Sequence, residues 1–250
     1  MNRISPTVKQ LLIINIIFYF GSVLSLNTDF IYSIFSLHFP ENPDFKFWQL
    51  LTHMFMHGGL MHLGFNMFAL WMFGSSIESI FGSRRFLFFY LTCGLGAAIS
   101  QIIFLYYSFY SNLDLLLSSG YDMESILSIL GEGKYNTSWE SVLGPEGLFT
   151  FNTSFLSTMV GASGAIMGVL VAFGMFFPDS KLMLIFFPVP VKAKYFIPAI
   201  ILLDLFSAIT GQAIFSPSNT AYIAHIGGAL TGFLIMYYWK RNQFNRNRWY

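Results

Sequence analysis

The chain has 250 residues, of which 55% are hydrophobic and only 10% are charged. Soluble globular domains carry about 25% charged residues, so this chain has too few charges to cover a soluble surface. Its net charge of +1 gives no reason to expect a nucleic-acid partner, and its single cysteine, Cys93, excludes a disulfide within these residues. The composition therefore predicts an all-α protein that lies in a membrane.

Six stretches are apolar enough for transmembrane helices, which need about 20 mostly apolar residues to cross the hydrocarbon. In chain order they are 11–26, 56–76, 86–109, 155–177, 196–211 and 221–239. No small-residue cleavage site follows the first stretch, which favours an anchored helix over a removed signal peptide. We therefore expect a bundle of six transmembrane helices.

The segments outside these stretches set the expected domain organisation. The divisions are a short cytoplasmic N-terminus at 1–10, a six-helix core at 11–239 with an extracytoplasmic insertion loop at 110–154, and a basic cytoplasmic tail at 240–250. Residues 178–195 contain the sequence FFPVPVKAK, whose two prolines argue against a regular helix there.

Basic residues predict the orientation of the chain in the membrane, because cytoplasmic loops are enriched in lysine and arginine. With six spans, one side of the membrane holds only Lys46 and Lys134. The other side holds Arg3, Lys9, Arg84, Arg85, Lys181, Lys192, Lys194, Lys240, Arg241, Arg246 and Arg248. Both termini are therefore expected in the cytoplasm, and the second, fourth and sixth spans enter from outside. Since no transit peptide precedes the first span, the expected membrane is a bacterial inner membrane.

Four polar side chains fall inside the second, fourth and sixth spans, where such groups are costly and by default functional. His62 and Asn66 are four residues apart in the second span and so share one helical face. Ser163 lies about nine residues into the fourth span, and His225 about five residues into the sixth. At 1.5 Å per residue, all four are expected about 8–14 Å from the outer helix ends.

A pair of glycines spaced four apart follows both Ser163 and His225 along the chain. The pairs are Gly164 with Gly168, and Gly228 with Gly232. Small residues at this spacing let two helix backbones touch. If the fourth and sixth spans pack through these faces, Ser163 and His225 come within hydrogen-bonding reach.

A serine beside a histidine points to nucleophilic catalysis. A serine hydroxyl needs an adjacent base, and histidine is the usual one because its reference pKa lies near neutral pH. The oxyanion that forms then needs donors, which Asn66, His62 and the backbone N–H of Ser163 offer.

No carboxylate that could join Ser163 and His225 as a third catalytic residue is evident in this polar layer. Asp204 in the fifth span is the only nearby acid, and the sequence gives no basis for assigning it to His225. Packing, or a ring such as that of Tyr222, is therefore expected to orient the imidazole.

Four motifs occur in order between residues 45 and 232. They are HxxxHxxxxHxxxN at His53, His57, His62 and Asn66, ExxxGS at Glu78, Gly82 and Ser83, GxSG at Gly161 to Gly164, and AHxxGxxxG at Ala224, His225, Gly228 and Gly232. In this order and on these spans, the motifs resemble those of the rhomboid family of intramembrane serine proteases.

The resemblance implies a six-helix rhomboid-like bundle with a water-accessible cavity open to the extracytoplasmic side. Ser163 would be the nucleophile and His225 the general base, with His62 and Asn66 in the oxyanion site. The packing and structural residues would be Gly161, Gly164, Gly168, Gly228, Gly232 and Glu78. The substrate would be a transmembrane segment of another protein in the lipid bilayer, with no cofactor, and the fifth span with loop 212–220 would form a lateral gate.

Two features depart from the family pattern. The family often has Trp-Arg in the first loop, whereas this chain has Trp48 and Gln49, which removes a loop-anchoring contact. The insertion at 110–154 is long, and its segment 115–130 has the pattern of an interfacial amphipathic helix, either a lid over the cavity mouth or a neutral addition.

Other functions fit the sequence less well than a protease does. A metal site at the clustered histidines is disfavoured because no carboxylate or thiol lies nearby. Solvated loop positions are expected for His38 and His53, and a structural hydrogen bond is expected for His57. A rhomboid-like binding protein that has lost catalysis is disfavoured by the intact serine and histidine. A transporter would show repeated halves with broken helices, which are not evident.

Overall fold

The computed structural model describes residues 4–184, 187–213 and 220–246, which form a helical bundle with one small β-hairpin. The elements are α1 (Pro6–Val23), α2 (Thr28–Phe35), α3 (Gln49–Thr52), η1 (His53–Phe55), α4 (Leu60–Ala69), the π-helical turn η2 (Leu70–Gly74), α5 (Ser75–Phe81), α6 (Ser83–Ser118), α7 (Met123–Gly131), η3 (Thr137–Trp139), α8 (Glu140–Leu156), α9 (Ser163–Phe176), β1 (Lys181–Leu184), β2 (Phe187–Lys192), α10 (Ala193–Thr210) and α11 (Tyr222–Arg246).

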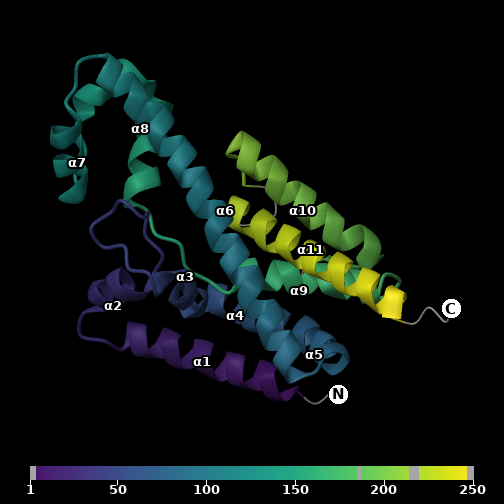
Figure 1. Ribbon diagram of the computed structural model, residues 1–250. Coiled ribbons are helices and arrows are strands. Elements are labelled where there is room, and N and C mark those ends of the chain that lie inside the picture. Colours follow the sequence, from purple (N-terminus) through teal and green to yellow (C-terminus); the bar gives the residue numbers. More distant parts are fainter. Residues whose placement is uncertain (1–3, 185–186, 214–219, 247–250) are drawn as a thin grey trace.

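The long helices lie side by side around α9 and α11 (Figure 1). Helix α11 packs along both α6 and α9, and α10 covers another side of α11. The start of α1 and the end of α11 lie at the same end of the bundle (Figure 1).

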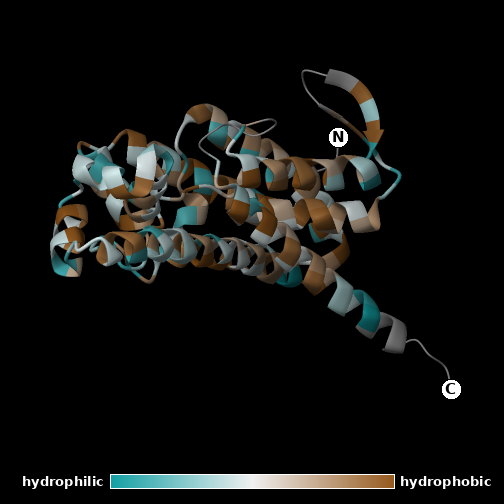
Figure 2. Cartoon of the chain, turned by 90° about the horizontal axis from the view of Figure 1, so that it is seen from above, coloured by the Kyte–Doolittle hydropathy of each residue, from teal (hydrophilic) through white to brown (hydrophobic). Residues whose placement is uncertain are grey.

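Among the described residues, four helices are long and apolar enough to cross a membrane: Pro6–Val23, Leu60–Phe81, Ser83–Ser118 and Ala193–Thr210. Large apolar side chains on these helices are exposed, including Ile17 at 62% and Ile103 at 64%, so they face lipid. In Figure 2, hydrophobic residues, coloured brown, occur all along the helices of the bundle. The chain is an all-α membrane protein, but the count of six spans is not confirmed, because only these four described helices meet both conditions and the apolar helix α9 has only 14 residues.

The expected fourth span, 155–177, is wrong at its start. Helix α8 ends at Leu156, a non-helical segment follows, and α9 begins at Ser163. Within this segment Ser157 is extended, and Gly161 has a φ of +121°, a conformation in which a residue with a side chain would be strained.

Residues 110–154 are mostly helical rather than an open loop. Helix α6 has 36 residues and is therefore roughly 54 Å long, longer than the roughly 30 Å hydrocarbon core. Beyond the bundle, α8 folds back along the outer end of α6, and α7 packs beside α8 (Figure 1). Phe39, Phe109, Trp139 and Phe151 form a second apolar core there, so this region is a packed unit.

The segment after α9 lacks a helix, as the two prolines predict, and forms an antiparallel hairpin of β1 and β2. At its base Asp179 pairs with Lys192 at 3.1 Å and Lys194 at 3.0 Å. Of the expected gate loop 212–220, residues 214–219 lie outside the described residues.

The first loop is held by Gln49, the residue that departs from the family pattern. Its side chain is fully buried, and Nε2 donates to the carbonyl oxygens of Asp44 at 2.8 Å, Ser33 at 3.0 Å and Ile34 at 3.3 Å. Its Oε1 accepts from the backbone N–H of His38 at 3.3 Å. A neutral amide therefore anchors this loop by both donating and accepting.

The solvated positions expected for His38 and His53 are wrong, because the two side chains are 6% and 2% exposed. The Nδ1 of His53 donates to the carbonyl of Gln49 at 2.8 Å, and burial lowers the pKa of His53 to about 4.

Candidate active site

Ser163 is the first residue of α9 and follows a loop that is fixed at two points. Met159 exchanges two backbone hydrogen bonds with Leu37, each 2.9 Å, and the N–H of Gly161 donates to the carbonyl of His53 at 2.9 Å. The half-buried Ser163 therefore has a defined position, next to the unpaired N–H groups of a helix N-terminus.

His225 is the fourth residue of α11 and contacts Ser163 directly. Its Nε2 lies 2.8 Å from the Oγ of Ser163, although the two residues are 62 positions apart in sequence. Its side chain is nearly buried, at 11% exposed.

The other nitrogen of the same ring contacts a carboxylate. The Nδ1 of His225 lies 2.7 Å from the Oδ2 of Asp204, which is 1% exposed on α10. A carboxylate accepts here, so Nδ1 carries the proton, Nε2 is the acceptor, and the hydroxyl of Ser163 donates to it. The expectation that no acid lies in this layer is therefore wrong.

His62 and Asn66 lie on α4, across from Ser163. A Cβ added to Gly161 would lie 2.8 Å from the ring of His62 and 3.7 Å from the Oγ of Ser163, so His62 and Ser163 flank this glycine. Asn66 is 7% exposed, and its Nδ2 donates to the carbonyl of His62 at 3.0 Å. The carboxamide has a second N–H beyond the one used in that bond.

The depth expected for Ser163 and His62 is too great, since α9 and α4 begin later than their apolar stretches, whereas His225 lies within one residue of its expected place along α11. Ser163 opens α9, His62 is the third residue of α4, and His225 the fourth of α11. All three groups are therefore near helix ends, and Asn66 lies about 6 Å further along α4 than His62.

Helices α9 and α11 approach closely because glycine faces glycine. A Cβ added to Gly232 would lie 2.6 Å from the Cα of Gly168, and one added to Gly228 would collide with the backbone of Gly164. With no side chains between them, the two backbones touch, and this contact brings the N-terminal ends of α9 and α11 together.

Glu78 lies at the opposite end of the bundle and links three segments. It accepts from the backbone N–H groups of Thr7 and Val8, both at 2.9 Å, and from the hydroxyl of Ser83 at 2.6 Å. The hydroxyl of Ser5 also donates to it. Its carboxylate thus caps the N-terminus of α1, where negative charge is favourable.

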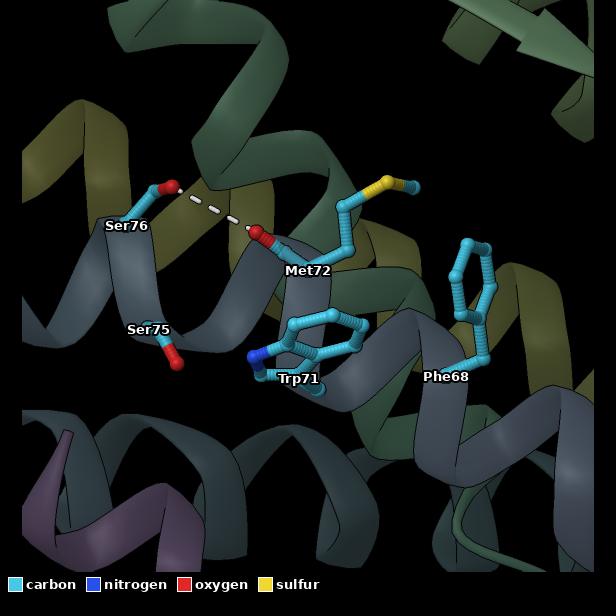
Figure 3. Close-up of a pocket in the computed structure, with 5 residues that line it drawn as sticks. All are labelled: Phe68, Trp71, Met72, Ser75 and Ser76. Carbon is cyan, nitrogen blue, oxygen red and sulfur yellow. Dashed lines mark hydrogen bonds between the residues drawn. The ribbon is translucent and has the colours of Figure 1, made fainter. Parts of the chain in front are cut away.

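Two hollows in the described part of the chain lie away from Ser163. One, of about 270 Å³, is lined by Phe68, Trp71, Met72, Ser75 and Ser76 on the outer face of α4, η2 and α5 (Figure 3). The other, of about 480 Å³, lies along α8, where Leu148, Phe149 and Asn152 line it. The described residues contain no cluster of three His, Cys, Asp or Glu side chains that would hold a metal ion.

Comparison with known proteins adds evidence independent of this geometry. The family model described as Rhomboid domain matches residues 44–242. The chain is 42% identical over 59 residues to the Rhomboid protease GluP of Bacillus subtilis, covering 24% of this chain and 12% of that protein. It is 29% identical over 214 residues to the human Presenilin-associated rhomboid-like protein, mitochondrial, covering 82% of this chain and 43% of that protein. It is 27% identical over 190 residues to the Rhomboid protein 1, mitochondrial, of Saccharomyces cerevisiae, covering 76% and 41%.

The relatives do not support a bacterial inner membrane in particular, because two of these three are mitochondrial by name. The chain spans less than half the length of each of these curated relatives. The family match covers most of the chain, which therefore belongs to the rhomboid family.

Proposed function

We propose that this chain is an intramembrane serine endopeptidase that cleaves transmembrane segments of other membrane proteins. Ser163 is the nucleophile and His225 is the general base. The observation that carries the proposal is the 2.8 Å contact between the Oγ of Ser163 and the Nε2 of His225, at the helix ends of a rhomboid-family membrane protein.

The reaction begins when the hydroxyl of Ser163 attacks the carbonyl carbon of the scissile peptide. The Oγ–H bond breaks as the Oγ–C bond forms, and the proton moves to the Nε2 of His225. His225 then returns the proton to the leaving amine, and water hydrolyses the acyl-enzyme by the same steps in reverse.

The oxyanion of the tetrahedral intermediate is held by the backbone N–H of Ser163 and by the side chains of His62 and Asn66. The N–H of Ser163 belongs to a helix N-terminus, where the backbone favours negative charge. Asn66 contributes the N–H that its bond to the carbonyl of His62 leaves over. Losing one such donor typically slows the reaction about 100- to 1000-fold.

Water and substrate reach Ser163 through a cavity that opens to the extracytoplasmic side, since the site lies at the bundle end away from Glu78 and Ser83. Both termini are cytoplasmic, because the basic residues of α1, the start of α6 and the end of α11 share one side. Residues 1–10 and 240–250 flank the protease core at 11–239, and residues 110–154 form its extracytoplasmic insertion.

The direct test is labelling by a serine-reactive fluorophosphonate of the purified protein in detergent. Wild type is expected to be labelled at Ser163, and the variants Ser163→Ala and His225→Ala are expected to be unlabelled and unable to cleave a transmembrane reporter. Ser157→Ala is the matched control, because Ser157 is an exposed serine in the loop before α9. Cleavage by Ser163→Ala at the wild-type rate would reject the assignment.

A further inference from the structure

Asp204 is a buried acidic residue on α10, a helix that is otherwise mostly apolar. Helix α10 buries only Ala193, Ile197, Asp204 and Ser207, and the acid is the most costly of these in a membrane. Its side chain is 1% exposed, so the carboxylate must be stabilised by a partner within the protein.

The partner is the base of the proposed reaction. The Oδ2 of Asp204 lies 2.7 Å from the Nδ1 of His225, whose Nε2 lies 2.8 Å from Ser163. One imidazole thus bridges an acid on α10 and a hydroxyl on α9, with α11 between them. We propose that Asp204 is a positioning residue for His225, so that the site is a Ser–His–Asp triad; this inference rests on the proposed function.

The carboxylate has two effects on the base. By accepting the Nδ1–H, it holds His225 in the tautomer whose Nε2 is free to accept the proton of Ser163. When that proton arrives, the ring becomes a cation. The carboxylate of Asp204, which stays ionised, stabilises this cation by its negative charge. No proton moves to Asp204 in either step.

Among the described residues, the groups on the other helices do not offer the same contact to Nδ1. On α9 the neighbour is Ser163, which meets Nε2, and on α4 the nearest titratable group is His62, a second imidazole. Helix α6 meets α11 at this level through Gly96 and Ser100. Tyr222, on the same helix as His225, lies near Asp204. The acid that touches the ring is therefore supplied by α10.

The test compares Asp204→Asn with Ser207→Ala. Ser207 is also 1% exposed and lies one turn further along the same face of α10, so its variant reports the effect of disturbing that packing. Asp204→Asn keeps the size of the side chain but removes the charge and the fixed acceptor. We expect its kcat on a transmembrane reporter to fall about 100- to 10,000-fold with KM within threefold, as when the acid of a serine protease triad is made neutral. Ser207→Ala is expected to stay within threefold of wild type.

A conservative variant separates positioning from packing. Asp204→Glu keeps a carboxylate and is expected to retain at least about tenfold more kcat than Asp204→Asn, and fluorophosphonate labelling should follow the same order. Equal kcat values for Asp204→Glu and Asp204→Asn would overturn the proposal. So would a wild-type kcat in Asp204→Asn, or a loss of kcat in Ser207→Ala as large as that in Asp204→Asn.

The proposed function and the triad fail in different ways. If wild type neither cleaves the reporter nor labels at Ser163, the protease assignment fails. If wild type cleaves and His225→Ala does not, while Asp204→Asn has normal kcat, the triad alone fails.

Discussion

The backbone of Gly228 on α11 lies directly against the backbone of Gly164 on α9, with no room for a side chain between them. Gly228 is three residues after His225, and Gly164 directly follows Ser163. The closeness of the two helices therefore sets the distance between the two groups that the proposed reaction needs.

Gly228→Ala is expected to destabilise the protein and abolish cleavage, because the new methyl would push α11 away from α9. Overpacking a core usually costs about 1–3 kcal/mol, and here the obstacle is backbone that cannot rotate away. The measurement is the melting temperature in detergent together with reporter cleavage. The control is Gly21→Ala in α1, where an added Cβ meets nothing within 4 Å. Equal melting temperatures for Gly228→Ala and wild type would contradict the packing described.

Gln49→Arg is expected to destabilise the protein, although arginine is common at this position in the family that the sequence resembles. The guanidinium has no acceptor, so the backbone N–H of His38 would lose its partner, and a charge would enter a fully buried site. A buried donor left unpaired costs about 1–3 kcal/mol. Thermal unfolding of Gln49→Arg and of the exposed control Lys46→Arg measures the difference. An arginine variant as stable as wild type would show that the loop adapts.

Protonation of His53 is expected to link folding to pH. Its pKa is lowered to about 4 in the folded protein, so the unfolded chain binds a proton near pH 6.5 while the folded chain does not. The stability from this group is complete above about pH 6.5 and falls by about 1.4 kcal/mol per pH unit down to about pH 4. Melting temperatures measured between pH 7.5 and 4.5 should fall more steeply for wild type than for His53→Gln. Parallel curves would contradict a buried neutral imidazole.

The sequence predicts the fold class and the main polar residues because they leave strong local signals. Apolar runs mark the spans, and Ser163, His62 and His225 stand out as polar groups within them. Spacing on one helix also shows which residues share a face, as for His62 and Asn66.

The role of Asp204 could not be predicted, because the rotation of one helix against another depends on packing rather than on local pattern. The available signal is that Asp204 and Ser207 are three residues apart, so α10 has one polar stripe, which had to face the protein. The sequence does not predict the start of α9 for a similar reason: hydropathy stays high through most of 155–162, whereas the extended backbone of Ser157, the bridge from Met159 to Leu37 and the positive φ of Gly161 keep this segment out of a helix.

Asn66→Ala is expected to slow turnover more than it weakens substrate association, because an oxyanion donor acts on the intermediate and not on bound substrate. The proposed role predicts a kcat about 100- to 1000-fold lower with little change in KM. The variant also loses the bond from Nδ2 to the carbonyl four residues earlier, which is structural. Asn15→Ala controls for that loss, because buried Asn15 makes the same bond to Leu11 at 2.7 Å. Equal kcat values for the two variants would remove Asn66 from the oxyanion site, whereas a deficit confined to Asn66→Ala would place its second N–H on the reacting oxygen.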